Sequence, residues 1–118
     1  SGDEVFAFVP DWESPFVKSL LAYIDGRISE PSLTGAELAV EAGVSRQQLF
    51  RKTKRLVGMS PHMLVRMRRL EYARNLMIDG GYSISEVCYM SGFSTPSYFS
   101  RCFRRQFGCL PSDMRGKA

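Results

Sequence analysis

The chain has 118 residues, a formal net charge of +4 at pH 7 and three cysteines. This length allows one compact unit with a buried core but is small for a polypeptide that carries out chemistry of its own. The cysteines (Cys88, Cys102 and Cys109) are odd in number and lack C-x-x-C spacing, which excludes a disulfide framework and fits a reducing cytoplasm, and no apolar run approaches the ~20 residues of a membrane span.

Residues 1–13 are predicted to be an arm at the end of a linker, and the first helix begins after them. Ser14-Pro15 is a typical helix start, and Glu30-Pro31-Ser32 ends the helix. Between these points an apolar stripe recurs at helical spacing. It is made by Phe16, Leu20, Leu21, Tyr23, Ile24 and Ile28.

The next two helices have the pattern of a helix-turn-helix. Thr34 is the N-cap candidate of a short helix, and Gly43 supplies the left-handed residue that a tight interhelical turn needs. Ser45 caps a further helix to Val57, with Leu49, Thr53 and Leu56 on its apolar side. Residues 14–60 are therefore expected to form a first subdomain.

The longest predicted helix starts at Ser60-Pro61, runs to about Ile78 and forms most of a connecting segment, residues 61–79. Its buried face is expected to consist of Leu64, Met67, Leu70, Ala73, Leu76 and Met77. Its arginines lie mostly elsewhere and are interpreted either as a solvated face with internal salt bridges or as contacts to passing phosphates. They are Arg66, Arg68, Arg69 and Arg74.

Residues 80–118 predict a second helix-turn-helix subdomain. Ser83 caps a helix over Ile84–Ser91, Gly92 turns the chain, and Ser94 or Thr95 starts a helix to about Phe107. A short final helix is expected after Pro111-Ser112. The spacing of four between Phe99, Phe103 and Phe107 predicts that these rings face the core and do not stack on bases.

The two predicted helix-turn-helix segments repeat each other. Residues from Ser45 to Pro61 match those from Thr95 to Pro111 at an offset of fifty, and the offset is forty-nine upstream, where Gly43 matches Gly92. A duplicated motif of this kind can contact two successive segments of one DNA groove. The sequence thus predicts an all-α fold of about seven helices, in which a long central helix joins two helix-turn-helix subdomains.

Charge is distributed unequally between the two parts of the chain. Residues 1–45 carry two basic residues against eight acidic ones, whereas residues 46–118 carry fourteen against four. A basic segment is typical of a protein that binds a polyanion, although a solvated basic face gives the same pattern. The repeat, and not the charge alone, favours DNA.

The outward faces of the two second helices hold side chains suited to DNA. An α-helix fits the major groove, where arginine can bond guanine and glutamine can bond adenine. Contacts with bases are predicted for Gln47, Gln48, Phe50, Arg51, Ser97, Ser100 and Arg101. Contacts with phosphates are predicted for Arg46, Lys52, Lys54, Arg55, Arg104 and Arg105. For Phe50, contact with a thymine methyl and packing against the first helix are both open.

Three segments resemble the DNA-binding domain of the AraC/XylS family of bacterial transcription regulators. They are GVSRQQLFRKTKRLVGMSP, RRLEYARNLM and ISEVCYMSGFSTPSYFSRCFRRQFGCLPSDMR, and the resemblance covers roughly residues 16–115. It implies that the helices Ser45–Val57 and Thr95–Phe107 dock in adjacent major-groove segments. Two positions depart from the pattern, since Gly35 stands where an apolar residue is usual and Pro96 cannot donate a hydrogen bond.

The part LFRKTKRLVGMSP is similar to the subset found at the C-termini of hybrid two-component regulators of Bacteroides-type bacteria. That resemblance implies sensor and receiver domains as partners within a full-length protein anchored in the inner membrane, with this domain in the cytoplasm.

We expect sequence-specific binding of a double-stranded DNA operator for transcription regulation, with no cofactor, metal or small-molecule ligand in this chain. An enzyme is not expected, because the single histidine, His62, has no companion nucleophile. The alternative is a protein-interaction module that docks on RNA polymerase or on its own regulatory domains, with only non-specific affinity for DNA. The two roles can coexist.

Overall fold

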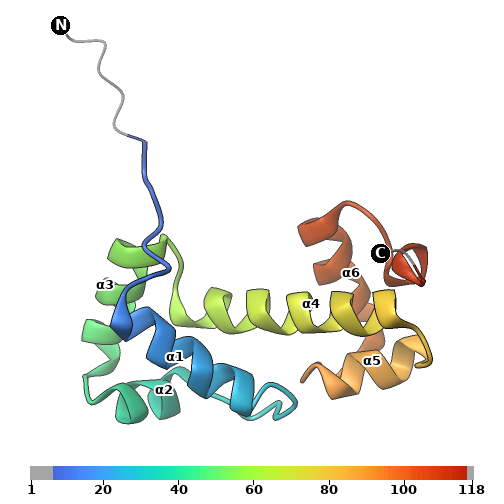
Figure 1. The fold of residues 1–118 in the computed structure, drawn as a ribbon. Coiled ribbons are helices and arrows are strands. Elements are labelled where there is room, and N and C mark those ends of the chain that lie inside the picture. The colour runs from blue at the N-terminus through green and yellow to red at the C-terminus, as the bar shows by residue number, and fades with distance from the viewer. Residues whose placement is uncertain (1–6, 117–118) are drawn as a thin grey trace, which may run out of the picture.

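The computed structural model describes residues 7–116, which form six α-helices and a terminal 3-10 turn (Figure 1). The helices are α1 (Pro15–Gly26), α2 (Gly35–Ala42), α3 (Arg46–Val57), α4 (Pro61–Asp79), α5 (Ile84–Met90) and α6 (Pro96–Phe107), followed by η1 (Pro111–Met114). The predicted all-α fold is confirmed. α4 is the long central helix, and one group of helices gathers at each of its ends (Figure 1).

Hydroxyl side chains fix the starts of most helices. Ser45, Ser60 and Ser83 each accept a hydrogen bond, at 3.1–3.2 Å, from the backbone N–H three residues further on. Each bond satisfies one of the free N–H groups of a helix N-terminus. Thr34 does the same for α2, whereas Thr95 makes no such bond and α6 begins directly at Pro96. The predicted starts of these helices are confirmed.

The helices bury two separate hydrophobic cores, and α4 contributes to both. Leu64 and Val65 belong to the first core, with α1, α2 and α3, whereas Leu70, Ala73 and Met77 belong to the second, with α5 and α6. Val65, like Val17 of α1, is buried although it was not among the predicted core residues.

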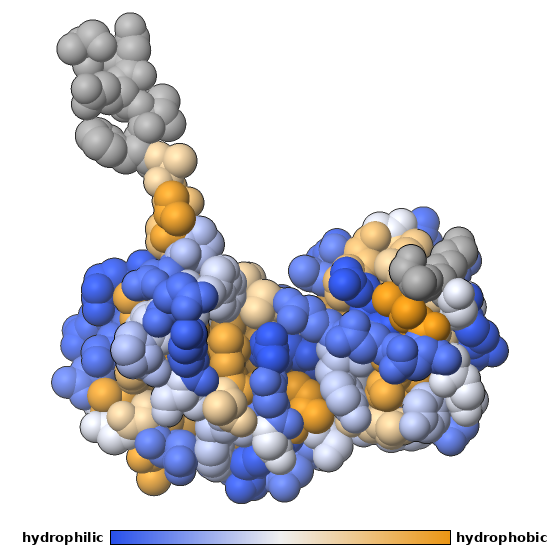
Figure 2. Space-filling model, in the orientation of Figure 1, coloured by the Kyte–Doolittle hydropathy of each residue, from blue (hydrophilic) through white to orange (hydrophobic). Residues whose placement is uncertain are grey.

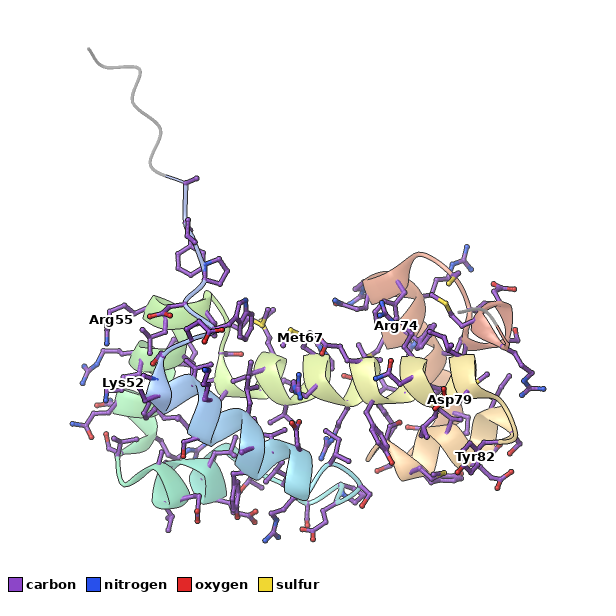
Figure 3. The ribbon with its side chains drawn as sticks, viewed as in Figure 1. Lys52, Arg55, Met67, Arg74, Asp79 and Tyr82 are labelled. Atoms are coloured by element: carbon purple, nitrogen blue, oxygen red, sulfur yellow. The ribbon has the colours of Figure 1, made fainter. Side chains whose placement is uncertain are left out.

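The phenylalanines of α6 behave largely as predicted. Phe99 and Phe103 are fully buried, and their rings lie 5.8 Å apart in an edge contact. Phe107 is only half-buried, because it lies at the last turn of α6, and Arg74 of α4 covers part of its ring at 5.3 Å from the ring centre. Arg74 is seen beside α6 in Figure 3.

The arm that precedes α1 is fastened to the end of α3. The N–H of Asp11 donates to the carbonyl of Leu56 at 2.7 Å, and Trp12 packs against the first core. The ring of Phe8 lies against Gly58, where a Cβ would come within 2.9 Å of it. Residues 1–6 of the predicted arm lie outside the described residues.

The surface of the molecule is mainly hydrophilic in the view of Figure 2, with small and separated apolar patches on both groups of helices. Within residues 7–116, no helix has both the length and the hydropathy that crossing a bilayer would require.

Candidate nucleic-acid interface

The predicted base-contacting side chains are accessible on α3 and α6. Gln47, Phe50 and Arg51 of α3 are exposed, as are Ser97 and Arg101 of α6, whereas Ser100 is half-buried. The opposite sides of these helices hold the buried Leu49 and Phe99 of the two cores. The cores therefore fix which face each helix presents outward.

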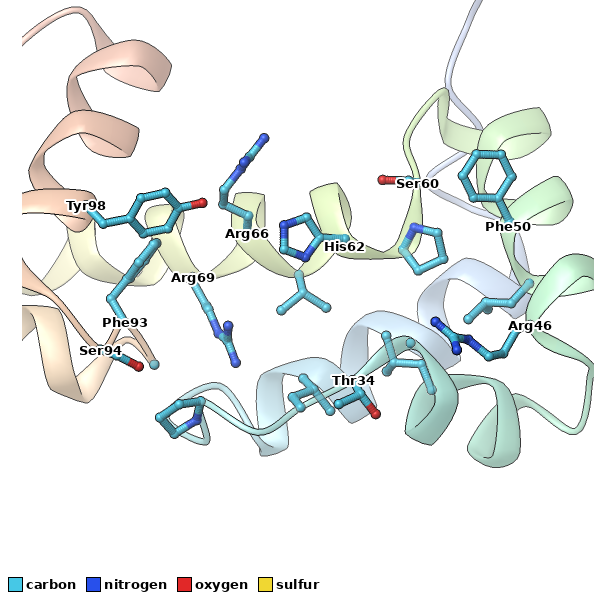
Figure 4. A pocket seen from close by; sticks show the side chains of 18 of the residues that line it. Thr34, Arg46, Phe50, Ser60, His62, Arg66, Arg69, Phe93, Ser94 and Tyr98 are labelled. Atoms are coloured by element: carbon cyan, nitrogen blue, oxygen red, sulfur yellow. The ribbon is translucent and has the colours of Figure 1, made fainter.

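Phe50 projects from the first turns of α3 and does not join the first core. Its side chain is 49% exposed, and it lines a groove that lies in front of α4 (Figure 4). Contact with a thymine methyl and packing against the first helix both stay predictions for Phe50. The ring is available for an apolar contact.

Gln48 has a structural role in addition to the predicted one. Its Oε1 accepts a hydrogen bond from the N–H of Ser45 at 2.9 Å, which completes a capping box at the start of α3. The Ser-x-x-Gln spacing is the sequence signal for such a box. The side chain is therefore held at the helix end, and its amide N–H groups are the part left for other contacts.

The candidate phosphate-binding cations are not neutralised by the protein. The salt bridges within residues 7–116 involve Lys18, Arg27 and Arg68, none of which lies on α3 or α6. The side chains of Lys52 and Arg55 project from α3 away from α4 (Figure 3). Among the six candidates, Lys52 is half-buried with its ammonium 4.5 Å from the centre of the Phe16 ring, and the exposed ones are Arg46, Lys54, Arg55, Arg104 and Arg105.

Of the four arginines of α4, Arg68 fits the interpretation as a salt-bridged face, Arg69 and Arg74 make other contacts within the protein, and contact of Arg66 with phosphates stays a prediction. Arg68 makes the predicted internal salt bridges, at 2.6 Å to Asp25 and 3.2 Å to Glu71, and its hydrogen bond to Asp25 raises its pKa. Arg69 donates to backbone carbonyls, and Arg66 lines the groove.

A groove of about 670 Å³ lies between the starts of α3 and α6 (Figure 4). Both helix-turn-helix segments and α4 line it, and the lining includes Arg46, His62, Arg66 and Arg69 but no acidic residue. The N-termini of α2, α4 and α6 open onto it through Thr34, Ser60 and Thr95, and helix N-termini carry partial positive charge. The groove is thus suited to an anionic partner. His62 was not predicted as part of a site, and for Arg66 contact with phosphates was one of two interpretations.

Four acidic residues lie in α1, α2 and the loop between them, namely Asp25, Glu30, Glu37 and Glu41. Glu37 accepts a hydrogen bond from the Tyr23 hydroxyl at 2.9 Å and pairs with Arg27, which also pairs with Glu30. Burial, followed by this hydrogen bond, raises the pKa of Tyr23. Ion pairs with neighbouring cations therefore account for part of the acidic charge, while α3 and α6 carry unpaired cations.

Comparison with known proteins decides the family. The family of helix-turn-helix domains matches residues 38–117. A solved transcriptional regulator from Chromobacterium violaceum, with an AraC-type DNA-binding domain, superposes with a TM-score of 0.83 at 30% identity, covering 89% of this chain and 93% of that chain. The chain belongs to the AraC-type helix-turn-helix family. It is a DNA-binding domain for transcription regulation.

Two further relatives place this AraC-type domain in context. The DNA-binding domain of AdpA, solved in complex with a target DNA, has a TM-score of 0.76 at 28% identity and covers 84% of this chain and 87% of that chain. Histidine kinase P4 of Formosa agariphila is 28% identical over 105 residues, which are 89% of this chain but 8% of the kinase. The chain thus spans a small part of that curated relative.

Proposed function

We propose that this AraC-type domain binds double-stranded DNA sequence-specifically, with α3 and α6 in two successive segments of the major groove. The observation that carries the proposal is the pair of accessible, cationic helix faces on either side of a groove without acidic residues. Two major-groove segments on one face of B-DNA are about 34 Å apart. Because α4 joins the two subdomains, the DNA bends where its helical repeat does not match their separation, at a cost of order 1–6 kcal/mol.

Side chains on the two helices divide between two tasks in this proposal. Near the helix starts, Gln47, Phe50 and Arg51 contact bases in one segment, and Ser97, Ser100 and Arg101 contact bases in the other. Gln48 adds at most its amide N–H groups. The phosphates are bound by Arg46, Lys52, Lys54, Arg55, Arg104 and Arg105, which release counterions and make the affinity salt-dependent.

The domain boundaries also belong to the proposal. Residues 14–60 and 80–118 are the two subdomains, and residues 61–79 connect them. The match to a histidine kinase supports a place at the output end of a hybrid two-component regulator, with sensor and receiver domains in the same protein. RNA polymerase is the proposed partner on the transcription side.

The experiment that tests the proposal is selection of duplexes from a random DNA library with this domain at moderate salt. We expect two short enriched blocks whose centres lie about ten base pairs apart. One block would restrict base contacts to one subdomain and contradict the two-helix arrangement. No enrichment, with weak binding to every duplex, would contradict sequence-specific binding and favour the docking module.

One observation favours the docking alternative as an additional role. Val40 of α2 and Tyr89 of α5 occupy equivalent positions in the two copies, and their side chains are 81% and 54% exposed. Apolar side chains exposed in this way can bind another protein. A Val40→Ser, Tyr89→Ser double variant should keep full affinity for a selected duplex but lose transcription activation. Normal activation by this variant would remove these residues from any protein contact.

A further inference from the structure

Arg69 extends from the middle of α4 to the loop that joins α1 and α2. Its Nη2 donates a hydrogen bond to the carbonyl of Glu30 at 2.6 Å, and its Nε donates to the carbonyl of Ile28 at 3.4 Å. These partners lie 39 and 41 residues away along the chain. Figure 4 shows the side chain descending from α4 toward that loop, beside Phe93 and Ser94 of the second subdomain.

The turn of the second helix-turn-helix packs against the same loop. Gly92 is buried at a φ of +85°, and a Cβ there would collide with the carbonyl oxygen of Ile28 and lie 2.6 Å from Nε of Arg69. No side chain can be accommodated at this point. Figure 1 shows the loop after α1 ending beside the α5–α6 connection. The two subdomains therefore meet directly, around one guanidinium group.

The charge of Arg69 is held at this place without a carboxylate. None of the salt bridges within residues 7–116 involves it, and burial lowers the pKa of its guanidinium. The acceptors are carbonyls just beyond the C-terminal end of α1, where the helix dipole favours a cation. A partly buried cation is stable only if its N–H groups are hydrogen-bonded. The loop belongs to the first subdomain, so movement of that subdomain away from α4 and Gly92 would remove this arrangement.

We propose that Arg69 is a positioning residue for DNA recognition, because it locks the two helix-turn-helix subdomains into one body and fixes α3 relative to α6. The lock is a property of the free protein, while its consequence for DNA rests on the proposed function. A fixed separation makes the domain discriminate between operators by the spacing of their two blocks. One inserted base pair moves the second block by about 3.4 Å and rotates it by about a tenth of a turn.

The lock is tested first without DNA. Spin labels are attached through ketone amino acids at Lys54 of α3 and Gln106 of α6, both exposed, so that the three native cysteines remain. Electron–electron resonance then gives the distribution of distances between the two helices. We expect one narrow distribution for the unsubstituted domain. For Arg69→Met we expect a distribution at least twice as wide, and for Arg69→Lys, which keeps the charge but loses the forked geometry, an intermediate width.

Arg68→Met is the matched control, because the neighbouring arginine also joins α4 to the first subdomain, through Asp25, whereas Arg69 is the one that lies against Gly92 of the second subdomain. Its distribution should stay narrow. A narrow distribution for Arg69→Met in a folded protein would overturn the proposal. If Arg69→Met fails to fold, Arg69→Lys decides, and a width equal to that of the unsubstituted domain would overturn it as well.

The consequence for DNA is tested with a selected duplex and two derivatives, in which one base pair is added or removed between the blocks. The unsubstituted domain should lose at least tenfold in affinity on either derivative, and Arg69→Met less than threefold. If Arg69→Met lost as much affinity on the two derivatives as the unsubstituted domain does, the inference would be overturned while the proposed function stands. If no duplex can be selected, the proposed function fails, and the distance measurement still decides on the lock.

Discussion

The two copies of the helix-turn-helix have the same helices but are stabilised differently. In the first, α3 starts with a capping box, and α1 and the arm pack around it. In the second, α6 starts without a side-chain cap, and its turn rests on the first copy through Gly92. The first copy is thus supported by its own segments, whereas the second depends on its neighbour. A repeated sequence pattern specifies the local turn and leaves the packing around it free to differ.

The cores of the two copies also differ in the kind of side chain that fills them. The positions of Thr53 in α3 and Phe103 in α6 are equivalent and both fully buried. Phe103 contacts the rings of Phe99 and Phe107, whereas the hydroxyl of Thr53 bonds the carbonyl of Phe50 within its own helix at 3.1 Å. The buried part of the second core is therefore built on aromatic rings in edge and tilted contacts, and that of the first on aliphatic side chains.

The largest difference between the copies is expected from truncation of these two residues. Phe103→Ala should lower the free energy of unfolding by about 3–5 kcal/mol, because it leaves a cavity. Thr53→Ala should cost about 1 kcal/mol. Urea unfolding followed by circular dichroism gives both values, and fluorescence of Trp12, in the first core, reports that subdomain separately. Equal losses would contradict the difference between the cores.

Substitution of the two turn glycines, Gly43 and Gly92, by alanine compares how closely each turn is packed by its neighbours. Gly43 has a φ of +69° and open space around it, so Gly43→Ala should cost about 1–2 kcal/mol for the left-handed backbone alone. Gly92→Ala adds the collision with Ile28 and should cost at least about 1 kcal/mol more. Calorimetric unfolding measures both. Similar values would mean that the second turn does not rest on the first subdomain.

Removal of one arginine from each copy tests whether both contact bases. Arg51→Ala and Arg101→Ala should each lose about 1–3 kcal/mol of binding free energy and relax specificity within one block only. Fluorescence anisotropy with a selected duplex and its single-base variants provides the measurement, with thermal unfolding as the control for folding. If either substitution weakened all duplexes equally, that arginine would be a phosphate contact.

Substitution of the residues that precede α3 and α6 should give a smaller difference in the free energy of unfolding. Ser45→Ala removes a cap and should cost about 1 kcal/mol, whereas Thr95→Ala, which removes no cap bond, should cost less than about 0.5 kcal/mol. Denaturant titration distinguishes these values. A larger loss for Thr95 than for Ser45 would show that the hydroxyl of Thr95 stabilises the second copy by another contact.

The smallest effect is expected for the equivalent cations Arg55 and Arg105, near the ends of α3 and α6. Each alanine variant should weaken binding to specific and random duplexes alike and lower the slope of log affinity against log salt by about one. Affinities at several salt concentrations give the slope. An unchanged slope would remove that arginine from the interface.

Local patterns made much of this fold predictable. The starts of α2, α3, α4 and α5 follow from a serine or threonine directly before each helix, whose hydroxyl accepts a hydrogen bond from the N–H three residues further on. The four residues involved are adjacent in the sequence, so the start can be recognised there. The positions of Gly43 and Phe99 also follow from spacing. The exposed faces of α3 and α6 could be predicted, because the apolar residues of each helix recur on one side and leave the opposite side outward.

What could not be predicted depends on partners far away in the sequence. The role of Arg69 depends on the loop at Ile28, and the crowding at Gly92 depends on both Ile28 and Arg69. The groove around His62 and Arg66 exists only once the two subdomains are placed on α4. Gln48 is different, because its Ser-x-x-Gln signal is local, yet a glutamine on a recognition helix fits base contact equally well.

The attachment of the arm has a mechanical consequence. Because Asp11 is bonded to Leu56 in the last turn of α3, and Phe8 lies against the glycine that follows, the path of the chain is fixed one residue after it enters the described structure. Any domain preceding residue 7 is tethered to the far end of α3 and not to α6. On bound DNA such a domain would lie beside the first block, which gives the complex a polarity along the duplex. Tension on the arm would act on α3 first.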